Sequence, residues 1–342
     1  MTLTSRPSID ALVLAANDVL FDVRASYHEA VREAVQAYLE HAVGLLPSSQ
    51  PLLTPAEVLL LQKKGRFTNY WDLTAAFVLY FVTLLPPVPA PTFPARFRLP
   101  GLVAYLQLAG GNLRVNIDDL RAERDIPGLA DMVSAAGGGL DAAYEALPEH
   151  NRHMLVDFGE INTTNVAVRI FQEIYLGATR FEAAYGQPPI VVQHQGYLGH
   201  ESLRIEPDLL AELAARLPLA VVSNRPRFEV EDQLARHGLV DRFQAVITLD
   251  DVKAGAGKPI PDGWPLLAAA RQLGTLTQQN AYVGANVGDI EAAKVANQQT
   301  PFLALGCLEE TPNKEAQRAN LEAYKATIIL DHPNDLKELI LG

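Results

Sequence analysis

The sequence has little of what binds nucleic acid, forms disulfides or crosses a membrane. The chain has 28 Lys and Arg residues and 40 Asp and Glu residues. Its net charge of −12 argues against binding to the phosphate backbone of a nucleic acid. Cys307 is the only cysteine, so the chain can form no internal disulfide and a reducing compartment is expected. The most apolar run, residues 73–85, contains two threonines and is too short to span a bilayer. Residues 1–10 lack the pattern of a secretory signal. We therefore expect a cytoplasmic protein that binds neither nucleic acid nor membrane.

Apolar runs of strand length alternate with helical patterns in the second half of the chain, which predicts a parallel sheet with helices on its faces. A similar run, residues 9–16, lies near the N-terminus and has the apolar character of a strand covered on both sides. The residues between these regions show mainly helical spacing, and residues 27–41, 55–64 and 166–185 are predicted to be helices. The sequence therefore predicts an α/β sheet domain that a large helical insertion interrupts after the first strand. The remaining predicted strands are residues 219–223, 245–248, 281–284, 302–306 and 326–330.

Four segments carry polar residues at strand ends or before a proline. They are residues 14–22, 221–226, 257–259 and 283–289. In this order they resemble the four motifs of the haloacid dehalogenase (HAD) superfamily, and the sequences at both ends of the insertion resemble its subfamily IA, the phosphoglycolate-phosphatase-like members. The resemblance implies a Rossmann-like (Rossmannoid) parallel-sheet core formed by residues 1–24 and 200–342. It also implies that residues 25–199 form an inserted helical cap.

The resemblance places residues without acidic side chains at several positions where the family has acids. Ala15 stands at the position of the nucleophilic aspartate, and Asn17 stands at that of the general acid/base. Asp18 takes the place of a usual glycine. In the fourth motif Ala285 replaces the first acid, and Asp289 is the only acid retained.

Active members of the family form an aspartyl-phosphate and hold Mg²⁺ with the nucleophile and the fourth-motif acid. A methyl group at Ala15 and at Ala285 can do neither, so we predict that no catalytic residue is intact and that neither a metal nor another cofactor is bound. The alternative is an active phosphomonoester hydrolase with a rearranged site, which would use Mg²⁺. Asp18 and Asp22 are the nearest carboxylates for that alternative.

The phosphate-holding half of the motifs remains, since Ser223, Asn224, Arg225 and Lys258 match positions that in the family contact phosphoryl oxygens or lie beside them. The sequence therefore predicts a catalytically degenerate, phosphatase-like protein that binds a phosphorylated small molecule or, through the cap, a protein partner. An ordinary structural reading stays open for these residues. Ser223 and Asn224 would then cap a helix, and Asp289 would serve only a helix N-terminus.

Two further features of the insertion are candidate sites. Glu149, His150, His153 and Asp157 have helix-like spacing that suits metal ligands, although solvated side chains are the commoner outcome. The apolar run at residues 73–85 and the Pro-rich residues 86–100 are candidate contact surfaces for a partner.

Overall fold

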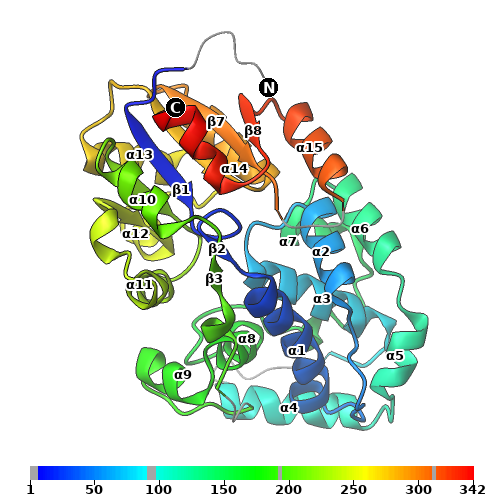
Figure 1. Ribbon diagram of the computed structural model, residues 1–342. Coiled ribbons are helices and arrows are strands. Elements are labelled where there is room, and N and C mark those ends of the chain that lie inside the picture. The colour runs from blue at the N-terminus through cyan, green and yellow to red at the C-terminus, as the bar shows by residue number, and fades with distance from the viewer. Residues whose placement is uncertain (1–6, 91–97, 192–194, 310–312) are drawn as a thin grey trace. The chain divides into compact units, whose positions relative to one another are not determined.

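The computed structural model describes residues 7–90, 98–191, 195–309 and 313–342. The chain divides into two compact units, which Figure 1 shows in one view. Met1–Val23 and Glu201–Gly342 form one unit, here called the core, and Arg24–His200 form the other, here called the helical unit. Within the described residues, no helix has the length and apolar character that crossing a membrane requires.

A six-stranded sheet organises the core, and its strand order is β5-β4-β1-β6-β7-β8. Each of its strand pairs is parallel, as the sequence predicted. Strand β1 lies between β4 and β6, and all of its residues are buried, which explains its uniformly apolar sequence. The strands are β1 Ala11–Ala15, β4 Leu219–Val222, β5 Ala245–Ile247, β6 Asn280–Gly284, β7 Phe302–Cys307 and β8 Ile328–Leu330.

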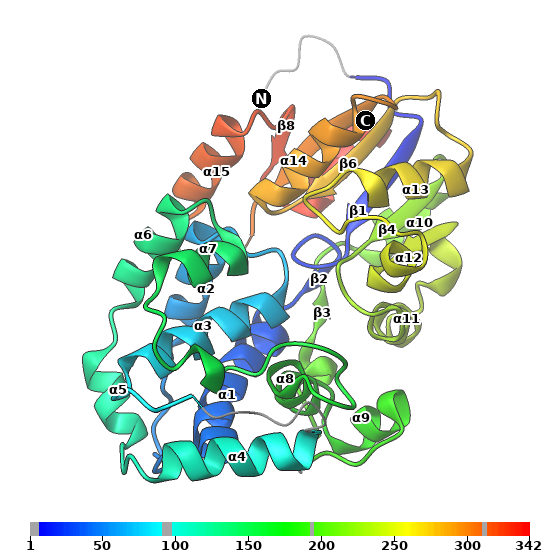
Figure 2. The ribbon, with the colours of Figure 1, turned by 180° about the vertical axis from the view of Figure 1, so that it is seen from behind.

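Helices cover both faces of this sheet (Figures 1 and 2). Helices α13 and α14 pack against each other and against the sheet on one face. Helix α10 and the C-terminal π-helical turn Lys337–Leu341 lie together on the opposite face. The predicted α/β class with a parallel sheet is therefore confirmed. The core helices are α10 Pro207–Ala214, α11 Arg227–Arg236, α12 Leu249–Ala254, α13 Trp264–Leu273, α14 Val287–Ala296 and α15 Lys314–Ala323.

A short antiparallel pair marks the place where the chain leaves the core and returns to it. Strand β2, Phe21–Asp22, pairs with β3, Ser202–Leu203, so that Asp22 lies opposite Ser202. The sequence contained no signal for this pair, because two-residue strands are too short for periodicity to reveal.

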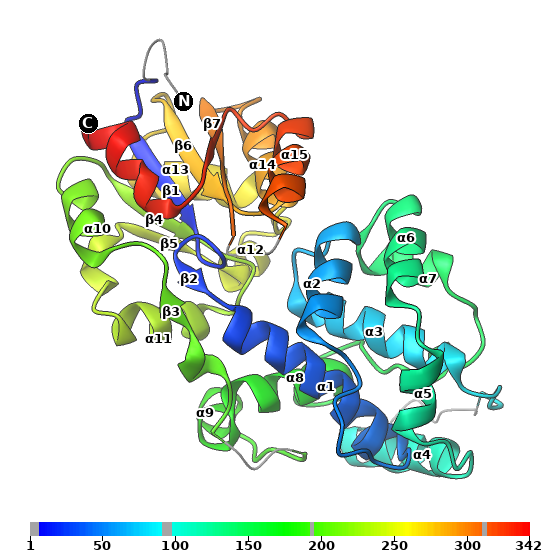
Figure 3. The same ribbon diagram turned by 45° about the vertical axis from the view of Figure 1, so that its right-hand side comes forward.

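The described residues of the helical unit form helices and turns, which Figure 3 shows from another side. Helix α2 starts sharply because Thr54 and Glu57 form a capping box and Pro55 occupies its first turn. The predicted helix at residues 166–185 is divided at Gly177, which has a φ of 75°. The helices are α1 Glu29–Ala37, α2 Pro55–Lys64, α3 Tyr70–Leu84, α4 Leu99–Gly111, α5 Ile117–Glu123, α6 Ile126–Ala135, α7 Gly139–Ala146, α8 Val166–Leu176 and α9 Ala178–Tyr185. Shorter 3₁₀ and π turns are Arg24–His28, Tyr38–Val43, Arg152–Met154 and Leu198–His200 in this unit, and Val240–Arg242 and Pro333–Asp335 in the core.

Helix α3 is the centre of the helical unit. It contacts α1, α7 and α8, and Leu73, Phe77 and Phe81 are fully buried. The hypothesis that this apolar run forms a contact surface for a partner is therefore wrong, because its side chains fill the interior of their own unit. Of the Pro-rich residues 86–100, those numbered 91–97 lie outside the described part of the chain.

Candidate functional site

The four motif segments meet at the carboxyl end of the core sheet. Ala15 is the last residue of β1, Ser223 follows β4, and Ala285 follows β6. These strands are neighbours, with β1 in the middle. The chain continues from β4 to one edge of the sheet and returns to β6 on the other side of β1. In open α/β sheets, ligands bind at such a switch point, outside the carboxyl ends of the strands.

The loop after β1 is a tight turn closed by backbone hydrogen bonds. The Leu20 N–H donates to the Ala15 carbonyl (3.2 Å), and the Asp18 N–H donates to the Phe21 carbonyl (2.8 Å). Asp18 has a φ of 61°, a conformation that costs roughly 1–2 kcal/mol for a residue with a Cβ. This backbone angle accounts for the glycine that the family has at this position. Asp22, the other nearby carboxylate, lies in β2.

Arg225 is buried in a network of charges beside Asn17. Its Nη1 and Nη2 atoms donate to the two carboxylate oxygens of Glu201 (3.1 and 3.0 Å), and its Nε donates to Glu229 (3.3 Å). Nη1 also donates to Asn17 Oδ1 (3.3 Å). The structure thus places Arg225 next to the general acid/base position, but two buried carboxylates already engage its guanidinium.

Sequence reasoning missed both carboxylate partners of Arg225. The spacing of Arg225 and Glu229 is the i, i+4 spacing of a helical ion pair, so this partner was detectable. Glu201 lies far away in the sequence, and no local pattern signals that contact.

Asn224 and Lys258, both predicted to contact phosphate, are linked through the backbone of one loop. The Asn224 amide donates to the Ile260 carbonyl and accepts from the Ile260 N–H, both at 3.1 Å. Lys258, two residues earlier, is exposed. Ser223 is 7% exposed, and its hydroxyl accepts from the Arg225 N–H (3.2 Å). The structure therefore places the loop that carries Lys258 beside Asn224, and Ser223, Asn224 and Arg225 make different contacts after β4.

Asp289, the retained acid of the fourth motif, is bonded to its own helix start and strand. One carboxylate oxygen accepts from the N–H groups of Ala285 and Asn286, both at 3.0 Å, and the other accepts from the Tyr282 hydroxyl (2.7 Å). Burial, and then the Asp289 charge, raises the pKa of Tyr282 well above its ordinary value, so its hydroxyl stays protonated and keeps donating. Asp289 is buried, and its hydrogen bonds stabilise the N-terminus of α14.

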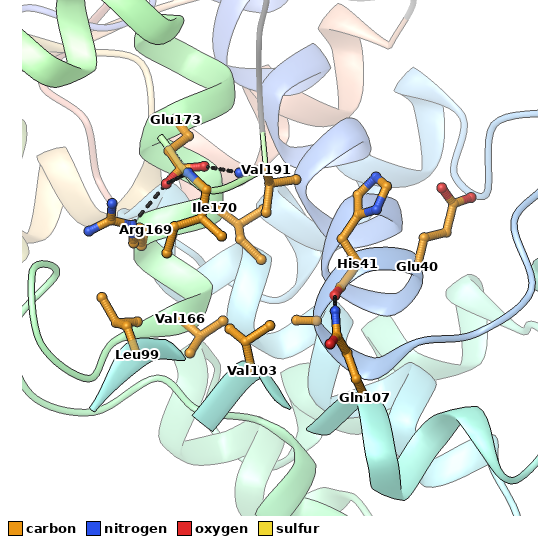
Figure 4. Close-up of a pocket in the computed structure, with 12 residues that line it drawn as sticks. Glu40, His41, Leu99, Val103, Gln107, Val166, Arg169, Ile170, Glu173 and Val191 are labelled. Atoms are coloured by element: carbon orange, nitrogen blue, oxygen red, sulfur yellow. Dashed lines mark hydrogen bonds and ion pairs between the residues drawn. The ribbon is translucent and has the colours of Figure 1, made fainter. Parts of the chain in front are cut away.

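The helical unit contains a pocket of about 270 Å³ between α4, α8 and the turn Tyr38–Val43 (Figure 4). Its aliphatic wall includes Val103 and Ile170. The pocket contains a buried ion pair between Arg169 and Glu173. The Glu173 carboxylate also accepts hydrogen bonds from the N–H groups of Ile190 and Val191 at 2.8 Å, so its oxygens are already engaged within the protein. None of the predicted site residues lines this pocket.

Of the histidines and acids at residues 149–157, His150 and Asp157 bond to separate groups. His150 Nε2 lies 2.7 Å from the Thr83 carbonyl oxygen, and Asp157 accepts from the Tyr144 hydroxyl (3.0 Å). Across the described ranges, no three or more His, Cys, Asp or Glu side chains form a group that could hold a metal ion.

A parallel sheet, a helical unit inserted after its first strand and polar motif residues at the carboxyl ends of its strands make up the fold that the resemblance to the HAD superfamily implied. The family described as haloacid dehalogenase-like hydrolase matches residues 206–302. The chain is 30% identical to the N-acetylmuramic acid 6-phosphate phosphatase of Pseudomonas aeruginosa over 39% of its own length and 55% of that protein. It is 39% identical to the phosphoglycolate phosphatase of Escherichia coli over 29% of its length and 38% of that protein.

The solved phosphatase Tt82 from Thermococcus thioreducens resembles the chain with a TM-score of 0.50 and 18% identity, over 97% of this chain and 99% of that one. This likeness concerns the fold alone. In sequence, the chain spans about half or less of the length of the curated relatives it matches. Residues 206–302 of the core thus match a haloacid dehalogenase-like hydrolase family, and the resemblance to HAD phosphatases predicted from the motifs is confirmed.

Proposed function

We propose that the core binds the phosphate group of a small phosphorylated molecule without hydrolysing it through an aspartyl-phosphate. One arrangement carries the proposal. At the carboxyl ends of neighbouring strands lie Ala15 and Ala285, which the motif resemblance aligns with the nucleophile and a metal ligand, whereas the Ser223 hydroxyl and the exposed Lys258 remain.

The chemistry of the missing groups supports the loss of hydrolysis. Ala15 offers no nucleophilic atom, and the Asn17 amide cannot exchange a proton near neutral pH. In a protease, removal of a nucleophile alone lowers turnover roughly a million-fold. We therefore expect no aspartyl-phosphate on this chain.

The residues present do not fit Mg²⁺, which takes oxygen ligands and commonly one or two carboxylates. Ala15 and Ala285 provide none, and Asp289 is already an acceptor for three internal donors. Magnesium dependence is therefore not part of the proposal.

Ser223 and Lys258 are the groups proposed to meet the phosphate. Arg225 is assigned a scaffold role, because Glu201 and Glu229 compensate its charge. The absence of carboxylates at residues 15 and 285 removes repulsion against a bound anion. The curated relatives named above are phosphatases of phosphorylated small molecules, which supports a phosphate monoester as the class of ligand.

Calorimetric titration of the full chain with inorganic phosphate and with phosphate monoesters tests this proposal. We expect dissociation constants on the order of 1 mM, and a loss of about tenfold, or ~1.4 kcal/mol, in Lys258→Ala. Lys253→Ala removes another exposed lysine, on α12, and should bind as the unchanged protein does. Equal binding heats for the unchanged protein, Lys258→Ala and Lys253→Ala would contradict the proposal.

A screen of phosphate esters with Mg²⁺ tests the alternative, an active hydrolase with a rearranged site. We expect no turnover. Turnover that disappears in Asp18→Asn or Asp22→Asn would favour the alternative. A protein partner of the helical unit and residence in the cytoplasm remain predictions.

A further inference from the structure

We propose that Asn224 is a positioning residue, whose amide holds the loop carrying Lys258 in place for the ligand. Asn224, in the second motif segment, would then act on the phosphate through Lys258, in the third segment. This inference rests on the proposed function, since it concerns how the same site presents its lysine.

The first anchor of the Lys258 loop is the Asn224 side chain. Both ends of its amide bond to one residue, with the Nδ2 donating to the Ile260 carbonyl and the Oδ1 accepting the Ile260 N–H. Ile260 is 6% exposed and Asn224 is half-buried, so these bonds are partly shielded from bulk water. An amide engaged at both ends is poorly available to a ligand and well suited to fixing a backbone segment.

The second anchor lies just before Lys258. The Gly257 N–H donates to the Val252 carbonyl (2.9 Å), and the Trp264 ring packs over the loop glycines. A Cβ added at Gly255 or Gly257 would lie 2.2 or 2.3 Å from that ring, so the backbone passes directly beneath the indole. Side chains at these two positions are excluded for this reason.

Between the two anchors only Lys258 and Pro259 are exposed. The Pro259 carbonyl accepts the Asp262 N–H (2.9 Å), which closes the loop behind them. The lysine therefore projects from a backbone that is fixed on both sides. A fixed origin lowers the ordering cost that a flexible loop would add to anion binding.

A double-mutant cycle on the full chain, read as affinity for inorganic phosphate, tests the assignment. We expect Asn224→Ala to weaken binding about three- to tenfold, and to change it by less than about 1.5-fold when Lys258 is already alanine. An effect of equal size in both backgrounds, or no effect in either, would overturn the inference, because Asn224 would then not act through Lys258.

Asn165→Ala is the matched control. Asn165, in the helical unit, also bonds to backbone in both directions, since it donates to the Asp157 carbonyl and accepts the Val168 N–H. Its loss should leave phosphate affinity unchanged. A loss of affinity like that of Asn224→Ala would show that the effect is general destabilisation and would count against positioning.

Hydrogen exchange separates the failure of this inference from the failure of the proposed function. If the unchanged protein does not bind phosphate, the proposed function is lost, but the loop can still be examined. Asn224→Ala should accelerate exchange at residues 257–262 at least tenfold and leave β4 and β6 unchanged. Asn224→Asp keeps the acceptor for Ile260 N–H and loses the donor, so it should give an intermediate rate. Unaltered exchange in this loop in both variants would overturn the inference.

Discussion

Arg225 and its partners explain why an amide suits position 17. Glu201 and Glu229 are almost completely buried, and both face one guanidinium. An aspartate at residue 17, where the family has its general acid/base, would add a third carboxylate to that single cation. Asn17 is half-buried, so this carboxylate would be a partly buried charge without a cation of its own, which is unfavourable. Asn17 instead accepts a hydrogen bond from Arg225 and adds no charge.

Asp72 provides a test of buried charge in the helical unit. Burial first, and then the charges of Asp157 and Asp141, raises its pKa from 3.8 to about 6. The folded state therefore holds this proton more tightly than the unfolded state does. The protonated Asp72 carboxyl contributes its full stability to the folded state below pH 4, and this contribution is lost as the pH rises through 6. We expect Asp72→Asn to raise the free energy of unfolding by about 2 kcal/mol at pH 7, and by nothing below pH 4.

The two tryptophans allow that measurement, because Trp71 lies in the helical unit and Trp264 in the core. Urea unfolding followed by Trp71 fluorescence in a Trp264→Phe background reports on the helical unit alone. Asp131→Asn is the control, since the Asp131 side chain is 65% exposed and should shift stability by less than about 0.5 kcal/mol. A gain in Asp72→Asn that does not depend on pH would contradict the titration argument.

At the scale of elements, the start of helix α14 depends on one carboxylate. Asp289→Ala would remove the cap on two N–H groups and leave the buried Tyr282 hydroxyl without its acceptor. We expect a loss of about 3 kcal/mol in the free energy of unfolding of the core, measured through Trp264 in a Trp71→Phe background.

Asp335→Ala is the comparison for that experiment. Asp335 also accepts two backbone N–H groups, those of Asp331 and His332, so its loss should cost about 1 kcal/mol. If Mg²⁺ stabilised the unchanged protein and this effect disappeared in Asp289→Ala, Asp289 would be a metal ligand and the structural assignment would be wrong.

The elements that the sequence predicted well are those whose signal is local. Helix α2 occupies the predicted residues because its capping box and proline lie within four residues of its start. Helix α12 was missed, because it is only six residues long and depends on a capping box between Thr248 and Asp251. The break at Gly177 was missed as well, since a Cβ there would lie 2.3 Å from the backbone of Gln195, a contact invisible in the local pattern.

At the scale of the whole molecule, the core is built from two separate segments and should fold by itself. Val23 and Glu201 flank the antiparallel pair of β2 and β3, so an Asn-Gly turn could join them as a hairpin. We expect a chain in which Asn-Gly replaces residues 24–200 to unfold in one cooperative urea transition reported by Trp264.

A deletion within the core is the control for this prediction. Removal of residues 1–23 takes away β1, which pairs with both β4 and β6, and should abolish cooperative folding. A joined core that binds hydrophobic dyes and unfolds gradually would show that the core needs the helical unit, and the prediction would fail.

The sequence by itself determined the α/β class and the chemistry that Ala15 and Ala285 cannot perform, because strand periodicity and side-chain identity are local properties. Only the tertiary structure decided what the surviving motif residues contact. Asn224 meets Ile260, and Arg225 meets Glu201 and Asn17, across stretches of chain that no local pattern connects. Parallel strands bring their carboxyl ends together only when the sheet is assembled, so these partners are specified by the fold and not by sequence spacing.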